Sequence, residues 1–315
     1  MKIAFVFPGQ GSQSIGMLDA WVDNEIINNF VARSSIVIGS DLGALISEGP
    51  IENLNLTVNT QPVMFTVGIA FFEAWRVSGG PMPNIMAGHS LGEYTALAAA
   101  GCLSLEDGVK LVKIRAQAIQ EAIPIGIGSM SAILGLDNRI IFTICKDISD
   151  NEIVVEPVNF NSPKQTVIAG HKTAVEKACK AAKLAGAKRV LTLPVSAPFH
   201  SSLLEPASHI LASALEKTLI QAPKIDVINN VDVKISDNPN VIRDALVRQI
   251  WNPVRWTETL KFMKTQGITH IVECGPGKIL SSFTKQMNLN INTLSISDPD
   301  SLEIALSTIG NFYKG

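Results

Sequence analysis

The sequence has 315 residues, of which 46% are hydrophobic and 17% charged, and its formal net charge at pH 7 is −2. A chain of this length can bury a large apolar core, and typical domain sizes predict about two domains. Because the net charge is close to zero, it gives no reason to expect nucleic acid or an anionic membrane as a partner. We therefore expect neither partner. We expect instead a substrate that is small or carried by another protein.

Secretion, membrane insertion and metal binding are not predicted. The first residues, MKIAFVFPGQG, are too short for a signal-peptide core, and the longest apolar run, VMFTVGIAFF, stops at Glu73, well short of a bilayer span. The cysteines lie far apart with no C-x-x-C pair, which argues against a zinc site or disulfides: Cys102, Cys145, Cys179 and Cys274. We expect a cytoplasmic protein that needs no metal or other cofactor.

The first part of the chain alternates apolar runs with helical patterns. KIAFVF at 2–7 and NIMAG at 84–88 are typical of buried strands. Residues 61–77 favour a helix, and further helices are predicted from Ser90 and from Leu105. This order predicts an α/β domain with a largely parallel sheet.

A second pattern follows, from about residue 127 to residue 196. It reads strand, helix, strand, strand, helix, strand, over 129–136, 137–148, 153–160, 165–170, 172–186 and 188–195. This β-α-β-β-α-β order is that of ferredoxin-like folds. We therefore predict a small inserted domain over residues 127–196.

The α/β pattern then resumes. A helix is expected after His200, a strand at 225–230, helices near 240–249 and 256–266, a strand at 269–275 and a final helix from Ser301. Residues 1–126 and 197–315 are thus predicted to form one large α/β-hydrolase-like domain with a parallel sheet. The cleft between the two domains is the natural place for a ligand.

The stretch AGHSLGEYTALAAAG places Ser90 between Gly88 and Gly92, in the pattern G-x-S-x-G. In this pattern a strand turns sharply into a helix and exposes the serine as a nucleophile. Backbone N–H groups at the start of the helix can stabilise an oxyanion there. The alternative is a serine that simply caps an ordinary helix.

The glycine-rich loop FVFPGQGSQ carries Gln10. Gly9 and Gly11 fit a dinucleotide fingerprint, but the third glycine is replaced by Ser14 and no G-K-[ST] follows, so both phosphate-binding motifs fail. The side-chain amide or the backbone N–H of Gln10 could donate to an oxyanion. The alternative is a tight turn with no chemical role.

Arg115 falls on the apolar stripe of a predicted helix, among residues such as Leu111, Val112 and Ile119. A buried guanidinium is costly unless it is paired, so we expect an anion at this position. The anion could be an acidic residue of the same protein. It could equally be a substrate carboxylate gripped in two parallel hydrogen bonds.

His200 lies in LPVSAPFHSSLL, where a predicted strand ends at the edge of the interdomain cleft. A histidine is the usual base for a serine nucleophile at neutral pH, although a helix-start role is the alternative. No acid between Ser90 and His200 is an obvious partner for the imidazole; the aspartates are Asp107, Asp137, Asp147 and Asp150. A backbone carbonyl could fix the tautomer instead, which would leave a serine-histidine dyad.

Eight motifs occur together and in order: FPGQGSQ, NTQP, GHSLGEY, RAQAIQ, APFHSSLL, NNVD, RQIWNPVRW and ECGPGKIL. In this order they resemble the malonyl-CoA:acyl-carrier-protein transacylases of bacterial fatty-acid synthesis, from Ile3 to about Gln286. The resemblance implies that Ser90 is the acylated nucleophile, that His200 is its base and that Arg115 holds the malonyl carboxylate.

The resemblance implies further roles near these residues. Gln10 and the backbone N–H of Leu91 would form the oxyanion hole, and Gln249 would orient His200 through its main-chain carbonyl. Phe199 resembles the malonyl-type rather than the methylmalonyl-type acyltransferases. The expected partners are malonyl-CoA and an acidic acyl carrier protein, which suits a basic rim; the chain is expected to be a monomer.

Two other functions stay open at this point. A serine esterase or thioesterase would share the first half of the reaction. A catalytically silent acyl-binding protein on the same fold belongs to a different class. Formation of an acyl-serine, and its discharge to carrier rather than to water, would separate the three.

Overall fold

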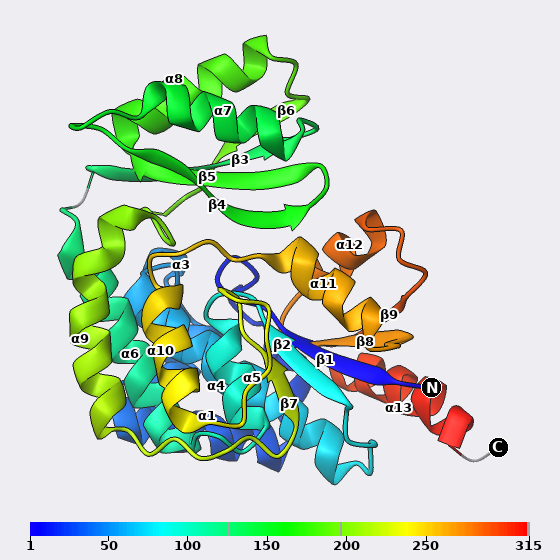
Figure 1. Cartoon of the computed structure of the whole chain (residues 1–315). Coiled ribbons are helices and arrows are strands. Elements are labelled where there is room, and N and C mark those ends of the chain that lie inside the picture. Colours follow the sequence, from blue (N-terminus) through cyan, green and yellow to red (C-terminus); the bar gives the residue numbers. More distant parts are fainter. Residues whose placement is uncertain (125, 196, 314–315) are drawn as a thin grey trace.

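The computed structural model describes residues 1–124, 126–195 and 197–313. It is a mixed α/β structure with a five-stranded sheet and a separate four-stranded sheet (Figure 1). The larger sheet has the order β7-β2-β1-β8-β9, and every neighbouring pair is parallel. Its strands are β1 (Ile3–Phe7), β2 (Ile85–Gly88), β7 (Asp226–Ile228), β8 (His270–Cys274) and β9 (Asn292–Ile296). The predicted parallel sheet is confirmed.

The parallel sheet is covered on both faces, which explains its continuous apolar strands. In β1 every residue is buried. Phe5 and Phe7 pack with helix α4 (Thr57–Val77) on one face, where Phe5 contacts Trp75. Ala4 and Val6 belong to the core on the other face, under α11 (Trp256–Thr265) and α12 (Ile279–Gln286).

The remaining helices pack against α4, against one another or, for the last helix of the chain, against β9. Those longer than one turn are α1 (Glu25–Ile38), α2 (Leu42–Ser47), α5 (Gly92–Ala99), α6 (Leu105–Ala122), α9 (Glu205–Lys217), α10 (Pro239–Gln249) and α13 (Pro299–Tyr313). Short turns lie at α3 (Ile51–Leu54), Asp19–Trp21 and Ser202–Leu204. None of the described helices is long and apolar enough to cross a membrane.

The second sheet is antiparallel, with the order β4-β5-β3-β6. It consists of β3 (Gly128–Leu134), β4 (Val155–Ser162), β5 (Gln165–His171) and β6 (Arg189–Thr192). Helices α7 (Asn138–Ile148) and α8 (Lys172–Leu184) cover one face and enclose their own small core, while the other face is turned toward the larger sheet (Figure 1). Main-chain bonds between Phe160 and Val254 and between Val254 and Val158 join β4 to the segment before α11.

Several elements differ from the sequence prediction. Helix α4 begins at Thr57, four residues before the predicted start at Gln61, and contains Pro62 within its second turn. Strand β9, α1 and α12 were not predicted; β9 is a partly exposed edge strand rich in polar residues. Residue 196, the last of the predicted small domain, lies outside the described residues, so the domain division stays a prediction.

Candidate active site

Ser90 occupies a strained turn between β2 and α5. Its φ of 54° is left-handed, which is uncommon for a residue other than glycine. A Cβ on Gly88 would lie 1.8 Å from the backbone of Gly92, and one on Gly92 would lie 2.0 Å from the carbonyl oxygen of Phe7. Both glycines of G-x-S-x-G are therefore required by close backbone approach, and the strained turn is that of a nucleophile elbow.

The structure brings Ser90 and His200 into hydrogen-bond contact, with 2.6 Å between Oγ and Nε2. On the other side of the ring, Nδ1 lies 2.8 Å from the main-chain oxygen of Gln249. Because a carbonyl oxygen can only accept, Nδ1 carries the proton and Nε2 is free to take the proton of Ser90. Within the described residues a backbone carbonyl thus stands where a triad would have a carboxylate.

His200 is kept uncharged by its surroundings. Burial, the larger cause, and the positive charge of Arg115 together lower the pKa of its imidazole to about 3. A neutral imidazole is the form that can act as a base, so His200 is in the form required of a base at neutral pH.

Arg115 is 1% exposed and lies beside Ser90. Its Nη1 donates to Gln61 Oε1 at 2.8 Å, and its Nη2 donates to Gln249 Oε1 at 3.0 Å and to Ser90 Oγ at 3.3 Å. None of the ion pairs among the described residues includes Arg115. The structural ion pair considered from the sequence is therefore wrong, because side-chain amide and hydroxyl oxygens take its place.

A buried guanidinium held by neutral acceptors retains its attraction for an anion. Burial lowers the pKa of Arg115, which reflects the cost of keeping its charge away from water. The ring of Tyr94 lies 5.4 Å from the guanidinium carbon and offsets part of this cost. An incoming carboxylate next to Ser90 would satisfy the charge more fully than the present partners do.

Glu93 was missed from the sequence, although it is a carboxylate in the first turn of an otherwise apolar helix. Its Oε2 accepts from the backbone N–H of Asn230 at 3.0 Å and from Gln249 Nε2 at 2.9 Å. Burial raises the pKa of Glu93 to about 7, although these hydrogen bonds act in the opposite direction. Gln249 is thus held at both ends, between Glu93 and Arg115.

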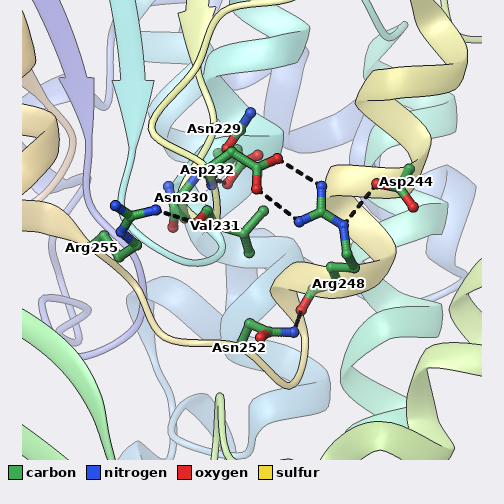
Figure 2. Close-up of polar contacts among 9 residues, drawn as sticks. Asn229, Asn230, Val231, Asp232, Asp244, Arg248, Asn252 and Arg255 are labelled. Carbon is green, nitrogen blue, oxygen red and sulfur yellow. Dashed lines mark hydrogen bonds and ion pairs between the residues drawn. The ribbon is translucent and has the colours of Figure 1, made fainter.

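A loop at residues 229–232 braces the elbow and α10 together. Asn230 Oδ1 accepts from the backbone N–H of Ser90 at 2.8 Å, and Asn230 Nδ2 donates to the carbonyl of Gly88 at 2.7 Å. Figure 2 shows the other end of this loop, where Asp232 accepts two hydrogen bonds from Arg248 at 2.7 and 2.9 Å. The residue that follows Arg248 is Gln249, so the loop connects Ser90 to the helix whose last carbonyl accepts from His200.

The loop after β1 packs against the elbow. A Cβ on Gly9 would lie 2.7 Å from the carbonyl oxygen of His89, so the two backbones approach closely. The next residue, Gln10, accepts a hydrogen bond at Oε1 from Thr57 Oγ1 at 2.7 Å. Leu91 stands directly before the first turn of α5, where amide groups have no partner within the helix.

A cavity of about 300 Å³ opens between the two sheets beside these residues. Its lining comes from the loop after β1, from the antiparallel sheet and from α12, and includes Gln10, His89, Asn161, Gln165, Leu193 and Phe283. His89 Nε2 lies 2.8 Å from Asn161 Oδ1 and so connects the elbow to the second sheet. The cavity reaches the turn that carries Ser90 at His89, while Ser90, His200 and Arg115 are not part of its lining.

Other predicted residues lie around this centre. Phe199 is largely buried beside His200, in the larger apolar core. Lys278 and Lys285 line a separate hollow between α12 and β9. All four cysteines are free thiols. Among the described residues, no group of three or more metal-ligating side chains is placed to hold a metal ion.

Comparisons with known proteins find a matching family model and similar proteins over nearly the whole chain. The family model described as the acyl transferase domain matches residues 4–288. The malonyl CoA-acyl carrier protein transacylase of Salmonella typhimurium is 49% identical, over 97% of this chain and 99% of that protein. That of Escherichia coli K12 is 48% identical, with the same shares covered.

Solved structures resemble the whole chain. An acyl-carrier-protein S-malonyltransferase from Burkholderia pseudomallei is 53% identical with a TM-score of 0.95, covering 98% of this chain and 100% of that one. A malonyl-transacylase in complex with its type II polyketide-synthase acyl-carrier protein is 46% identical with a TM-score of 0.96, with the same shares covered.

Proposed function

This chain belongs to the acyl transferase family, and we propose that its Ser90 centre carries a malonyl group from malonyl-CoA to an acyl carrier protein. The enzyme is a malonyl-CoA:acyl-carrier-protein transacylase. One observation carries the assignment of residues: Ser90 Oγ contacts both His200 Nε2 and Arg115 Nη2. A nucleophile, its base and a cation for the substrate carboxylate thus meet at one oxygen atom.

In the first half-reaction Ser90 Oγ attacks the thioester carbonyl of malonyl-CoA while His200 Nε2 takes its proton. The oxyanion that forms receives hydrogen bonds from Gln10 and the backbone N–H of Leu91, each lowering the barrier by roughly 2.7 to 4 kcal/mol. When the carbon–sulfur bond breaks, His200 returns the proton to the coenzyme A thiolate. The product is a malonyl ester on Ser90.

The second half-reaction reverses these roles. The phosphopantetheine thiol of the carrier gives its proton to His200 and attacks the ester carbonyl. The carbon–oxygen bond breaks, and His200 returns the proton to Ser90. The Gln249 carbonyl, which accepts from Nδ1 in the resting enzyme, stabilises the imidazolium formed in each half.

Selectivity for malonyl follows from Arg115. The malonyl carboxylate adds a charged acceptor to the side-chain oxygens that hold the guanidinium, so a charged acyl group gains a hydrogen-bonded pair that acetyl cannot form. Phe199 beside His200 limits the space for a branched acyl chain. We infer that the malonyl-carrier product supplies fatty-acid synthesis.

We also infer the finer architecture. Residues 127–196 constitute a ferredoxin-like small domain inserted into an α/β-hydrolase-like domain of residues 1–126 and 197–315; the β-α-β-β-α-β order with strands β4-β5-β3-β6 supports this division. The chain is proposed to act as a monomer, as expected from the sequence. The cytoplasmic location expected from the sequence stays a prediction.

The test is the intact mass of the purified protein after mixing with malonyl-CoA or acetyl-CoA, with Ser90→Ala as the control. We expect a malonyl adduct stronger than the acetyl one, absent from the control and discharged by holo acyl carrier protein. Coenzyme A release without an adduct would identify a thioesterase. Neither adduct nor release would indicate a binding protein.

A further inference from the structure

Thr57 is a buried polar residue for which the reaction described above has no role. It is the first residue of α4 and is 8% exposed. Its hydroxyl accepts from Gln61 Nε2 at 2.9 Å and donates to Gln10 Oε1 at 2.7 Å. Thr57 therefore joins a residue that holds Arg115 to a residue of the proposed oxyanion hole.

The directions of these hydrogen bonds are determined by Arg115. A guanidinium can only donate, so the atom of Gln61 that meets Arg115 Nη1 at 2.8 Å must be the carbonyl Oε1. This turns Gln61 Nε2 toward Thr57, whose oxygen must accept. The hydroxyl proton of Thr57 is then free for Gln10, and it is donated to Gln10 Oε1.

Gln10 is thereby held in one orientation. With Oε1 occupied by Thr57, an exchange of the oxygen and nitrogen of this side chain would take the acceptor away from the Thr57 hydroxyl proton. Gln10 lines the cavity, and the neighbouring Gly9 packs against the backbone of His89, so the anchored side chain also fixes the backbone of this loop. The hydrogen bond from Thr57 therefore keeps the side-chain and backbone N–H groups of Gln10 in place.

We propose that Thr57 is the positioning residue of the oxyanion hole, holding Gln10 in place through its hydroxyl. The inference rests on the proposed function and adds a residue to it. It also gives Gln61 two contacts. Its Oε1 accepts from Arg115, which selects the acyl group, and its Nε2 donates to Thr57, which positions Gln10.

The test compares the rates at which malonyl-CoA and acetyl-CoA load Ser90 in a single turnover. Thr57→Val removes the hydroxyl with little change in volume, and Thr57→Ser retains it. Thr60→Val is the matched control, because Thr60 lies one turn along the same helix, is fully buried, and directs its hydroxyl to the carbonyls of Leu54 and Leu56. Thermal unfolding of each variant verifies the fold, and Thr57→Ala replaces a valine variant that does not fold.

We expect Thr57→Val to slow both malonyl and acetyl loading about tenfold, part of the roughly 100-fold or greater loss seen when an oxyanion donor is removed. The apparent affinity for the acyl-CoA should change little, because the oxyanion forms only in the transition state. Thr57→Ser and Thr60→Val should remain within about twofold of the unmodified enzyme. In a Gln10→Ala background, Thr57→Val should cause no further loss, since both changes disrupt the same contact.

Acetyl loading is the decisive measurement, because acetyl does not use Arg115. If Thr57→Val slows the loading of malonyl but not that of acetyl, Thr57 acts on Arg115 and the inference is wrong. Unchanged rates for both acyl groups, or a full additional loss in the Gln10→Ala background, would also overturn it. If the unmodified enzyme itself forms no acyl-Ser90, the proposed function fails instead, and the two failures are thus told apart.

Discussion

Asn230 holds Ser90 from the side: its Oδ1 accepts the backbone N–H of the nucleophile at 2.8 Å, and its Nδ2 donates to the carbonyl of Gly88 at 2.7 Å. One side-chain amide therefore satisfies two main-chain groups of a strained, buried turn. Strain of this kind persists only where surrounding contacts hold the backbone in place. The geometry of the nucleophile consequently depends on a residue 140 positions away in the sequence.

Asn230→Ala should weaken both stability and activity. It leaves the Ser90 N–H and the Gly88 carbonyl without their partner, at an expected total of about 3 kcal/mol of unfolding free energy. Relaxation of the turn should also slow acylation of Ser90. Urea unfolding and single-turnover loading measure the two effects, and full stability in the alanine variant would contradict the bracing role.

Arg248→Lys should loosen the connection between the elbow and the base. Arg248 grips both carboxylate oxygens of Asp232 (Figure 2), and a lysine ammonium cannot reproduce this fork. Because both side chains are about one-third exposed, we expect a loss of only about 1 kcal/mol of stability. Acyl loading should slow several-fold as Gln249 and His200 shift.

The control for this variant is Arg76→Lys. Arg76 forms a similar fork with Glu73 near the end of α4, away from the elbow. Arg76→Lys should leave acyl loading unchanged. If both substitutions slowed loading equally, the contact between Arg248 and Asp232 would have no special role in loading.

Arg115→Ala should lower selectivity for malonyl. The malonyl carboxylate loses its cation, whereas acetyl loses nothing, so acetyl should load relatively better. Arg115→Lys should be only partly tolerated, because a point charge cannot contact Gln61, Gln249 and a carboxylate in the same plane. The ratio of malonyl to acetyl loading rates measures the change, and an unaltered ratio would remove Arg115 from substrate selection.

Acyl loading should be insensitive to pH in the range where an ordinary histidine titrates. Because the pKa of His200 is lowered to about 3, mainly by burial, the imidazole stays neutral and able to act as a base from pH 8 down to pH 5. Acetyl-CoA is the appropriate substrate, since it carries no carboxylate. A fall in kcat/KM centred near pH 6.5 would refute this.

Arg115→Ala provides an internal check on the same measurement. The charge of Arg115 is the second cause of the lowered pKa of His200, so its removal should move that pKa upward. The loss of acetyl loading at acid pH should accordingly begin at a higher pH in the variant. Identical pH profiles would mean that burial alone sets the pKa.

Glu93→Gln should change stability in a pH-dependent way. The pKa of Glu93 is raised from 4.5 to about 7, mainly by burial, so between these values the folded protein holds more protons than the unfolded chain. Glu93 therefore makes the unmodified protein less stable as pH rises from about 4.5 to 7, by up to about 3 kcal/mol. Glutamine removes this titration.

The stability of Glu93→Gln relative to the unmodified protein should thus increase as pH rises through that interval. Urea unfolding at pH 5 and pH 8 measures the difference. A glutamine can still accept from Asn230 and Gln249, so acyl loading should be largely retained. A stability difference that is the same at both pH values would mean that Glu93 does not titrate in this interval.

The features that the sequence determined are those that short stretches encode. G-x-S-x-G predicts the turn at Ser90 because both glycines are needed where backbones approach to 1.8 and 2.0 Å, and glycine spacing is visible in the sequence. Alternating apolar runs and amphipathic helices likewise predicted the parallel sheet. The helical stripe placed Arg115 in the interior, where the structure has it 1% exposed.

The tertiary structure decided what each of these residues touches. Helical spacing could not show whether Arg115 meets an acid or neutral oxygens, because its partners Gln61 and Gln249 are 54 and 134 residues away. Glu93, Asn230 and Thr57 were missed for the same reason: each acts through a hydrogen bond that forms only when distant segments meet. Local sequence determines the conformation of the backbone and the side that is buried, whereas the pairing of buried polar groups depends on the packing of the whole chain.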